Sequence, residues 1–197
     1  MLSYEESLKI LKETKAIIDG HFILSSGLHS SQYVQCAQLL SKPFKAEKFC
    51  ISLADKISKE FNKIDLILSP AMGGVIIGYE LGRLLKIETI FSERVDGEFN
   101  LRRGFEIQKN ANVLIVEDVI TTGKSSLECS QLIEISNAKL IGYACLIDRS
   151  NGVSKLNKKI ISQIKINIPT YKENELPKNL ISIPATKPGS RDIKWIK

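Results

Sequence analysis

The sequence predicts an α/β fold in which a mostly parallel central sheet is flanked by helices. Segments with strand-like and helix-like patterns alternate along the chain, and residues 113–116 form a continuous aliphatic run, Val-Leu-Ile-Val. Such a run is typical of a strand buried on both faces, and the alternation is typical of parallel strands joined by helical crossovers. Because ligands of these sheets bind beyond the carboxyl ends of the strands, we expect the functional residues there.

Local patterns predict the individual elements. Apolar residues recur near helical spacing after Ser3, a suitable helix cap, and Pro43 suits the first turn of a helix. The Asp96-Gly97 pair between two strand-like segments is a strong hairpin signal. In chain order we expect a helix at 4–18, turns and short strands at 19–36, a helix at 43–61, a strand at 64–68, a helix at 73–85, hairpin strands at 88–95 and 98–105, a strand at 113–116, a helix at 124–136 and a strand at 139–147.

Length and composition bound the class of protein. The chain has 197 residues, of which 43% are hydrophobic and 25% are charged, as in an ordinary globular domain. Its amino terminus lacks the apolar core of a signal peptide, and no apolar run approaches the roughly 18 residues of a membrane span. We therefore expect one domain over residues 1–197 that remains in the cytoplasm without membrane contact.

Neither the charge distribution nor the cysteines indicate binding of nucleic acid or zinc. The net charge of +6 is concentrated in residues 155–197, which hold ten Lys or Arg against three acidic residues, interspersed with apolar residues. This pattern favours a solvated surface over nucleic-acid contact. The four cysteines are widely spaced and the chain has only two histidines, so we expect no zinc site and four reduced, mostly buried thiols.

The segment after the aliphatic run carries the clearest chemistry. Glu117 and Asp118 come first, and then Thr121, Thr122 and residues 123–125, Gly-Lys-Ser, open the next helix. Hydroxyls, closely spaced backbone N–H groups and a helix N-terminus together bind a phosphate dianion. Two acids beside an anion site suit a different part of the ligand, such as a pair of sugar hydroxyls. The implied ligand is a ribose 5-phosphate.

Two alternatives compete with this interpretation. Residues 123–125 match the end of the nucleotide P-loop pattern, but that pattern requires glycine where this chain has Asp118. The other alternative is a capped helix that follows a buried strand, with its acids exposed by chance. The length and chemical coherence of the segment favour the ribose phosphate.

Residues 113–126 closely resemble the phosphoribosyl-diphosphate motif of the type I phosphoribosyltransferases, and the flanking segments match the orotate members of that family. The resemblance implies the fold of that family with a small hood subdomain, formed by about residues 1–40, and a carboxyl-terminal segment at about 155–197 that completes the hood and the sheet edge. In the family, the acids hold the ribose hydroxyls and the following turn wraps the 5-phosphate. This assigns phosphoribosyl-diphosphate binding to Glu117, Asp118, Val119, Ile120, Thr121, Thr122, Gly123, Lys124 and Ser125.

A glycine pair follows the strand expected at 64–68. The sequence there is Ser-Pro-Ala-Met-Gly-Gly, and paired glycines permit close approach of backbone N–H groups to an anion. A helix start that merely tolerates glycine explains the same residues equally well. The resemblance implies that this is the diphosphate-binding loop, with Ala71, Met72 and Gly73 as its binding residues.

Arg149 follows the strand expected at 139–147, and its planar fork suits a carboxylate. An ordinary surface ion pair is the alternative. Orotate carries a ring carboxylate, and the resemblance implies that Arg149 and Thr121 contact it. Residues 20–34 also resemble the segment that helps to cover the base in the orotate family, although any hairpin could have this composition; within it, His29 is expected to be a surface hydrogen-bonding group.

Arg94, Arg102 and Arg103 lie where many orotate phosphoribosyltransferases carry a mobile, lysine-rich loop that reaches into the partner subunit. Arginine stays protonated, so these residues can clamp a leaving diphosphate but are poor proton donors. The lysine role therefore does not transfer to this chain. A basic hairpin that protects a sheet edge is the alternative.

The resemblance implies transfer of the phosphoribosyl group from phosphoribosyl diphosphate to orotate, with Mg²⁺ as cofactor, by a homodimer. The implied catalytic residues are Asp118, Glu117, Arg94, Arg102 and Arg103, and no protein ligand of the metal is assigned. Two alternatives remain: a phosphoribosyltransferase for a purine base, and a non-catalytic regulator that senses phosphoribosyl diphosphate.

Overall fold

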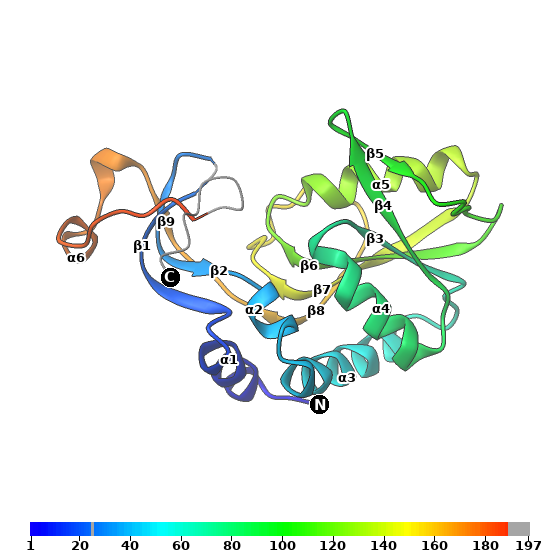
Figure 1. Ribbon diagram of the computed structural model, residues 1–197, viewed down its shortest axis with the longest axis horizontal. Coiled ribbons are helices and arrows are strands. Elements are labelled where there is room, and N and C mark those ends of the chain that lie inside the picture. Colours follow the sequence, from blue (N-terminus) through cyan, green and yellow to red (C-terminus); the bar gives the residue numbers. More distant parts are fainter. Residues whose placement is uncertain (25, 189–197) are drawn as a thin grey trace.

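A six-stranded sheet forms the centre of the computed structural model, which describes residues 1–24 and 26–188 (Figure 1). Neighbouring strands in the order β5-β4-β3-β6-β7-β8 are parallel, except for the antiparallel pair β4 and β5. The mostly parallel α/β fold expected from the sequence is therefore confirmed. The strands are β3 (Leu66–Pro70), β4 (Thr89–Val95), β5 (Glu98–Leu101), β6 (Asn112–Ile120), β7 (Lys139–Asp148) and β8 (Ile160–Lys165).

Helices cover both faces of this sheet. Helices α3 (Pro43–Glu60) and α4 (Gly73–Leu85) pack on one face, and α5 (Lys124–Ile135) packs on the other (Figure 1). Successive residues of β6 therefore enter different clusters: Leu114 and Val116 pack with α3 and α4, whereas Val113 and Ile115 pack with α5. All four residues are fully buried, which explains their continuous aliphatic run.

Glycines let α4 approach the sheet closely. A Cβ atom at Gly78 would lie 2.1 Å from the Ser69 hydroxyl oxygen, and one at Gly74 would lie 2.8 Å from the Val116 carbonyl oxygen. Any larger residue would push the helix away from β3 and β6. This close packing fixes the amino-terminal end of α4 beside the carboxyl ends of both strands.

A smaller antiparallel sheet stands beside the large one (Figure 1). Its order is β1-β2-β9, so a strand from the carboxyl-terminal region joins two strands from the amino-terminal region. From the carboxyl-terminal segment, β8 forms an edge of the large sheet and β9 joins the small one. The remaining elements are α1 (Tyr4–Glu13), β1 (Ile17–Ile23), β2 (His29–Val34), α2 (Ala37–Leu40), β9 (Thr170–Tyr171), the 3-10 turn η1 (Glu173–Glu175) and α6 (Lys178–Ile181).

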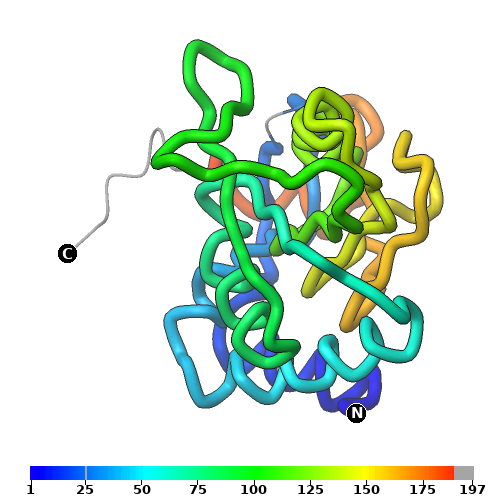
Figure 2. The backbone as a smooth tube through the Cα atoms, turned by 90° about the vertical axis from the view of Figure 1, so that its right-hand side faces the viewer, coloured from blue at the N-terminus to red at the C-terminus, as the bar shows by residue number. Residues whose placement is uncertain are grey.

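Several predicted boundaries are confirmed. Helix α4 has the predicted limits, Ser3 caps α1, and the hairpin turn has positive φ at both Asp96 (49°) and Gly97 (91°). In Figure 2 this β4–β5 hairpin projects from the body of the molecule. The local sequence signals therefore predicted these three features correctly.

Other predicted boundaries were wrong, because tertiary packing determines where those helices and strands begin and end. The first helix ends at Glu13 instead of residue 18, because Lys15 adopts a φ of 59° and Ile17 begins β1. The second hairpin strand ends at Leu101, since Arg103 (61°) and Gly104 (73°) form a turn. Strand β3 runs two residues later than predicted, and β6 extends four residues beyond the predicted end.

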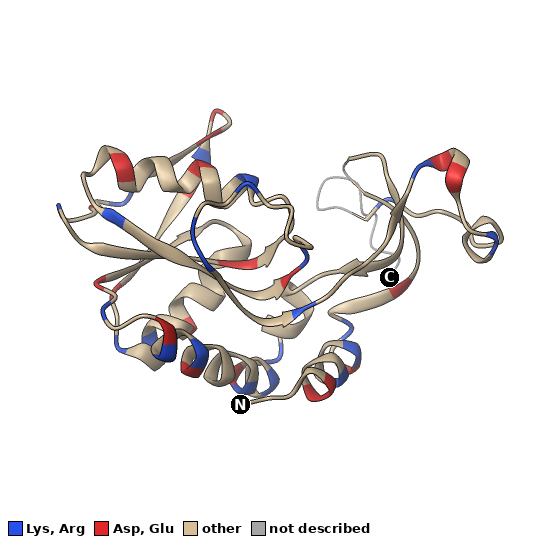
Figure 3. Cartoon of the chain, turned by 180° about the vertical axis from the view of Figure 1, so that it is seen from behind, with Lys and Arg blue, Asp and Glu red and all other residues tan. Residues whose placement is uncertain are grey.

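Charged residues are dispersed over several elements, with both signs mixed along α1 and α3 (Figure 3). All four cysteines are buried and free, as expected. Within the described ranges, no helix has both the length and the apolar character needed to cross a membrane.

Candidate active site

The end of β6 and the start of α5 form the centre of the candidate site. Because β6 continues to Ile120, Glu117 and Asp118 belong to the strand itself instead of a loop after it. The exposed Thr121 and Thr122 follow, and Gly123 begins the helix with a φ of 76°. A Cβ atom at Gly123 would also lie 2.7 Å from Leu156, so both the backbone conformation and the packing require glycine.

The two carboxylates are partly shielded from solvent, and no salt bridge reaches them in the described residues. Burial raises the pKa of Glu117 to about 7; the Ser126 hydroxyl, which donates a 2.8 Å hydrogen bond to it, lowers the value, and the neighbouring Asp118 raises it. Burial also raises the pKa of Asp118, against the effect of a 2.8 Å hydrogen bond from the Val119 N–H. Both acids therefore have capacity to accept further hydrogen bonds from a ligand.

The loop after β3 lies directly against Asp118. A Cβ atom at Gly73 would be 2.8 Å from an Asp118 carboxylate oxygen, so the absence of a side chain creates this proximity. The Ala71–Met72 peptide bond is cis, and Met72 is 84% exposed. The structure thus brings the predicted diphosphate loop, residues 71–73, together with the predicted ribose carboxylate.

A cavity of about 640 Å³ opens between the small sheet and the carboxyl edge of the large one; we call it the base cavity. Its size is suited to a small planar ligand. It contains Thr121 and Arg149, the two residues predicted to bind orotate. The full lining is Leu24, Ser26, Tyr33, Thr121, Thr122, Arg149, Ser150, Asn151, Val153, Ile168, Thr170 and Pro188.

Arg149 is the one charged residue among the described residues that line this cavity. Its Nε atom is buried and has no hydrogen-bond partner among the described residues, where the guanidinium also forms no salt bridge. Burial lowers the pKa of Arg149, while nearby Tyr33 acts in the opposite direction. A buried donor without a partner is costly, so the Arg149 side chain is a candidate to pair with an anionic group of a ligand.

Sequence reasoning missed part of the cavity wall. Tyr33 lies in the segment that resembles the orotate family, which was the only signal for it, and Ile168 and Thr170 come from a region with no recognised motif. The expectation for His29 was wrong. This residue is only 7% exposed and its Nδ1 lies 2.6 Å from Nε2 of His21, because the two strands β1 and β2 enclose the pair.

The three candidate arginines lie apart from the base cavity, and each already has an acidic partner. Arg94 forms an ion pair with Glu128 of α5 and stacks over Phe99 at 4.1 Å. Arg103 and Arg102 reach Glu93 at 2.7 and 3.8 Å. Their side chains are 39–60% exposed, and none lines the base cavity. In this arrangement they stabilise the hairpin, and only exchange of partners would free them for a ligand.

The donor chemistry fits Mg²⁺ held mainly by substrate oxygens. Mg²⁺ commonly uses one or two protein carboxylates together with phosphate oxygens and water. Asp118 supplies an available carboxylate beside the glycine loop, whereas no group of three or more candidate metal ligands occurs within residues 1–24 and 26–188. An Mg²⁺ ion that binds together with the diphosphate would need few protein ligands, because phosphate oxygens and water supply the others.

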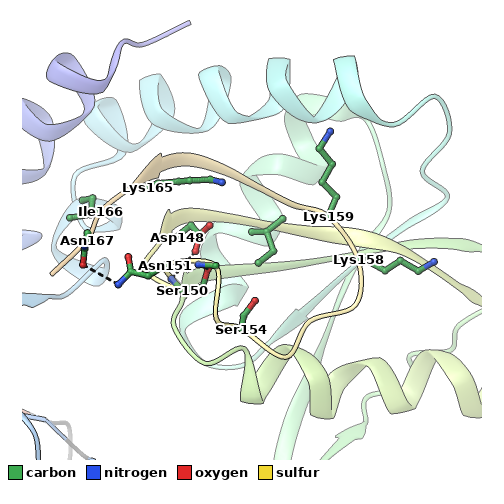
Figure 4. Close-up of a pocket in the computed structure, with 11 residues that line it drawn as sticks. Asp148, Ser150, Asn151, Ser154, Lys158, Lys159, Lys165, Ile166 and Asn167 are labelled. Carbon is green, nitrogen blue, oxygen red and sulfur yellow. Dashed lines mark hydrogen bonds between the residues drawn. The ribbon is translucent and has the colours of Figure 1, made fainter. Parts of the chain in front are cut away.

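A second cavity, of about 560 Å³, shares Ser150 and Asn151 with the base cavity. Figure 4 shows that its lysines do not converge: Lys159 points toward α3, where it pairs with Glu60 at 2.6 Å, and Lys158 points away. Because the charges diverge, the described lining of this cavity does not focus positive charge on one point.

Comparisons with known proteins agree with this geometry. Residues 40–178 match the family model of the phosphoribosyl transferase domain. The chain is 47% identical to an orotate phosphoribosyltransferase of Parvibaculum lavamentivorans, covering 98% of this chain and 100% of the relative, and 46% identical to one of Erythrobacter litoralis, covering 95% and 97%. Among solved structures, the orotate phosphoribosyltransferase of Aeropyrum pernix aligns with a TM-score of 0.69 at 21% identity, covering 80% of this chain and 92% of that one.

Proposed function

The chain belongs to the orotate phosphoribosyltransferases of the type I phosphoribosyltransferase family, and from this premise we propose how its residues perform the reaction. As a member of that family it is a transferase of pyrimidine biosynthesis, acting on orotate. The phosphoribosyl group moves from phosphoribosyl diphosphate to a ring nitrogen of orotate, giving orotidine 5-phosphate and diphosphate.

The phosphoribosyl group binds in the turn after β6. Backbone N–H groups and hydroxyls of residues 121–125 hold the 5-phosphate at the amino-terminal end of α5. Glu117 and Asp118 accept hydrogen bonds from the two ribose hydroxyls, which suits their partial burial and the shortage of other partners. The diphosphate lies against residues 71–73, where Gly73 permits backbone approach next to Asp118.

Arg149 selects the base, and its position is the observation that carries the proposal. The ring carboxylate of orotate pairs with the guanidinium, whose Nε is buried without a partner in the described chain, and Thr121 donates a further hydrogen bond from the same cavity. A purine base has no carboxylate and would leave this buried charge unpaired. The cavity therefore favours orotate over the purine alternative.

Departure of the diphosphate leaves positive charge on the ribose. Asp118 lies next to that charge and stabilises it electrostatically. Bound with the diphosphate near Asp118, Mg²⁺ would supply charge neutralisation of the leaving group. Arg94, Arg102 and Arg103 contact the leaving diphosphate by exchanging their acidic partners for its oxygens, and in a homodimer this contact would cross between subunits.

The hood function is also part of the proposal. The sheet β1-β2-β9 covers the base. It belongs to the hood at about 1–40, to which residues 155–188 also contribute. Residues 1–197 work as one domain. The cytoplasmic location, the homodimer and the absence of nucleic-acid partners stay predictions.

Ultraviolet-monitored loss of orotate tests the proposal directly. Purified protein with phosphoribosyl diphosphate should consume orotate in the presence of Mg²⁺ and stop when a chelator is added. Hypoxanthine, adenine and uracil serve as control bases. Equal turnover of uracil would contradict the role of Arg149, because uracil differs from orotate by the ring carboxylate.

A further inference from the structure

The carboxyl-terminal arm, defined here as residues 182–188, lies along the free edge of β1. The Thr186 N–H donates to the His21 carbonyl oxygen at 2.8 Å, and the Ile23 N–H donates to the Thr186 carbonyl oxygen at 2.8 Å. The arm therefore runs parallel to β1, with Thr186 opposite Phe22. These bonds cover a strand edge of the hood with a segment from the other end of the chain.

The side chain of His21 fastens the arm a second time. Its Nδ1 lies 2.9 Å from the Ile183 carbonyl oxygen, and its Nε2 lies 2.6 Å from Nδ1 of His29. Because a carbonyl oxygen can only accept, Nδ1 of His21 carries a hydrogen, and the facing ring nitrogens of His21 and His29 share a second hydrogen bond. The residues are 5% and 7% exposed, so little water competes for these bonds.

The arm reaches the base cavity. Pro188 lines this cavity together with Arg149 and Thr121, whereas neither histidine does. Strand β2, which carries His29, also carries the lining residue Tyr33. The same hydrogen-bonded pair thus connects two parts of the cavity wall that are far apart in the sequence.

We propose that His21 and His29 are positioning residues for base binding, because their hydrogen-bonded pair holds the carboxyl-terminal arm against β1 and thereby places Pro188 at the wall of the base cavity. The inference rests on the assignment of that cavity to orotate. A rigid wall limits the motion of a bound planar base, so its release weakens base binding. The turn after β6 belongs to the large sheet, and its binding of phosphoribosyl diphosphate is independent of the arm.

The variant His21→Phe tests this link, since it removes both ring hydrogen bonds and retains an aromatic ring. We expect the KM for orotate to rise about tenfold, as for the loss of one or two buried hydrogen bonds, while kcat and the KM for phosphoribosyl diphosphate change less than about twofold. Thr186→Pro removes the backbone donor from the arm itself and should give the same split. The double variant should be no worse than either single variant, because both changes release one contact.

Hydrogen exchange at the Thr186 amide measures arm release independently of activity. Exchange should accelerate in His21→Phe, and Ser182→Ala, a change at an exposed arm residue outside the pair, should alter neither exchange nor KM. An unchanged KM for orotate despite faster exchange would overturn the proposal, and so would additive KM effects in the double variant. If Arg149→Ala also leaves the KM for orotate unchanged, the cavity assignment itself is wrong. Thr186→Pro provides the same test if His21→Phe does not fold.

Discussion

The carboxyl ends of β6 and β7, as one region, and the β4–β5 hairpin both present charges near the carboxyl edge of the sheet, but these charges differ in burial and in partners. Glu117, Asp118 and Arg149 are partly or largely buried without a salt bridge in the described residues. Arg94 and Arg103, in contrast, are more exposed and paired with Glu128 and Glu93. Retaining an unpaired buried charge costs free energy, whereas an exposed ion pair costs little. The unsatisfied groups are therefore better candidates for ligand contact than the arginine cluster.

The largest expected effect comes from Asp118→Asn. Loss of the carboxylate charge beside the ribose should reduce kcat about a hundredfold, corresponding to roughly 3 kcal/mol of transition-state stabilisation. Steady-state kinetics would measure this, with circular dichroism to confirm the fold. Asp55, whose side chain is 44% exposed and pairs with Lys59, provides the matched control Asp55→Asn with near-normal turnover. A normal rate for Asp118→Asn would remove the ribose-site assignment.

Arg149→Ala should have the second-largest effect on the kinetics. Loss of a charge-assisted contact to the orotate carboxylate costs about 2 kcal/mol or more, so kcat/KM for orotate should fall about thirtyfold. The exposed Arg83 is paired with Glu80 at 2.7 Å, and Arg83→Ala serves as the control. An unchanged kcat/KM in Arg149→Ala would show that an unsatisfied guanidinium does not identify the base site, and the comparison between the two regions would lose its main support.

Arg103→Ala should have a smaller effect, because this side chain is 59% exposed and already has Glu93 as a partner. We expect kcat/KM for phosphoribosyl diphosphate to fall about threefold to tenfold, the range for a solvent-screened contact of about 1 kcal/mol. Glu93→Gln frees the same arginine and should not reduce this value. A loss as large as that of Asp118→Asn would break the comparison, since a paired, exposed charge would then matter as much as a buried one.

The smallest effect concerns the pH dependence of Glu117. Its pKa is raised to about 7 by burial, so kcat/KM for phosphoribosyl diphosphate should rise as pH increases through about 7, when the carboxylate forms and can accept ribose hydroxyl bonds. Glu117→Gln should lack this limb of the profile. If the variant keeps the limb, another group causes it.

The same pKa shift predicts a change in stability. The folded protein binds this proton more tightly than the unfolded chain, whose carboxyl has an ordinary pKa of 4.5. The resulting stabilisation is complete below about pH 4.5 and is lost as pH rises to about 7. Chemical denaturation across this pH range should show this loss of unfolding free energy in the wild-type protein and not in Glu117→Gln. An equal pH dependence of the unfolding free energy in both proteins would contradict the raised pKa.

Several structural features of this protein could be predicted from local sequence patterns. The aliphatic run before Glu117 predicted a strand buried on both faces and the Asp96-Gly97 pair predicted a hairpin, and both are confirmed. The anion site at 121–125 stays a prediction. Each depends on neighbours within a few residues, where backbone preferences and side-chain periodicity act directly. The family followed from the same segment.

Contacts between distant segments were decided only by the tertiary structure. Three features depend on how closely elements pack: the placement of Gly73 against Asp118, the buried Nε of Arg149, which has no partner among the described residues, and the position of the carboxyl-terminal arm on β1. The ion pairs of the hairpin arginines were equally invisible, because any exposed arginine can find an acid. Sequence patterns state what a segment can do, but burial and partners arise from packing between elements, and these determine which charges remain available for a ligand.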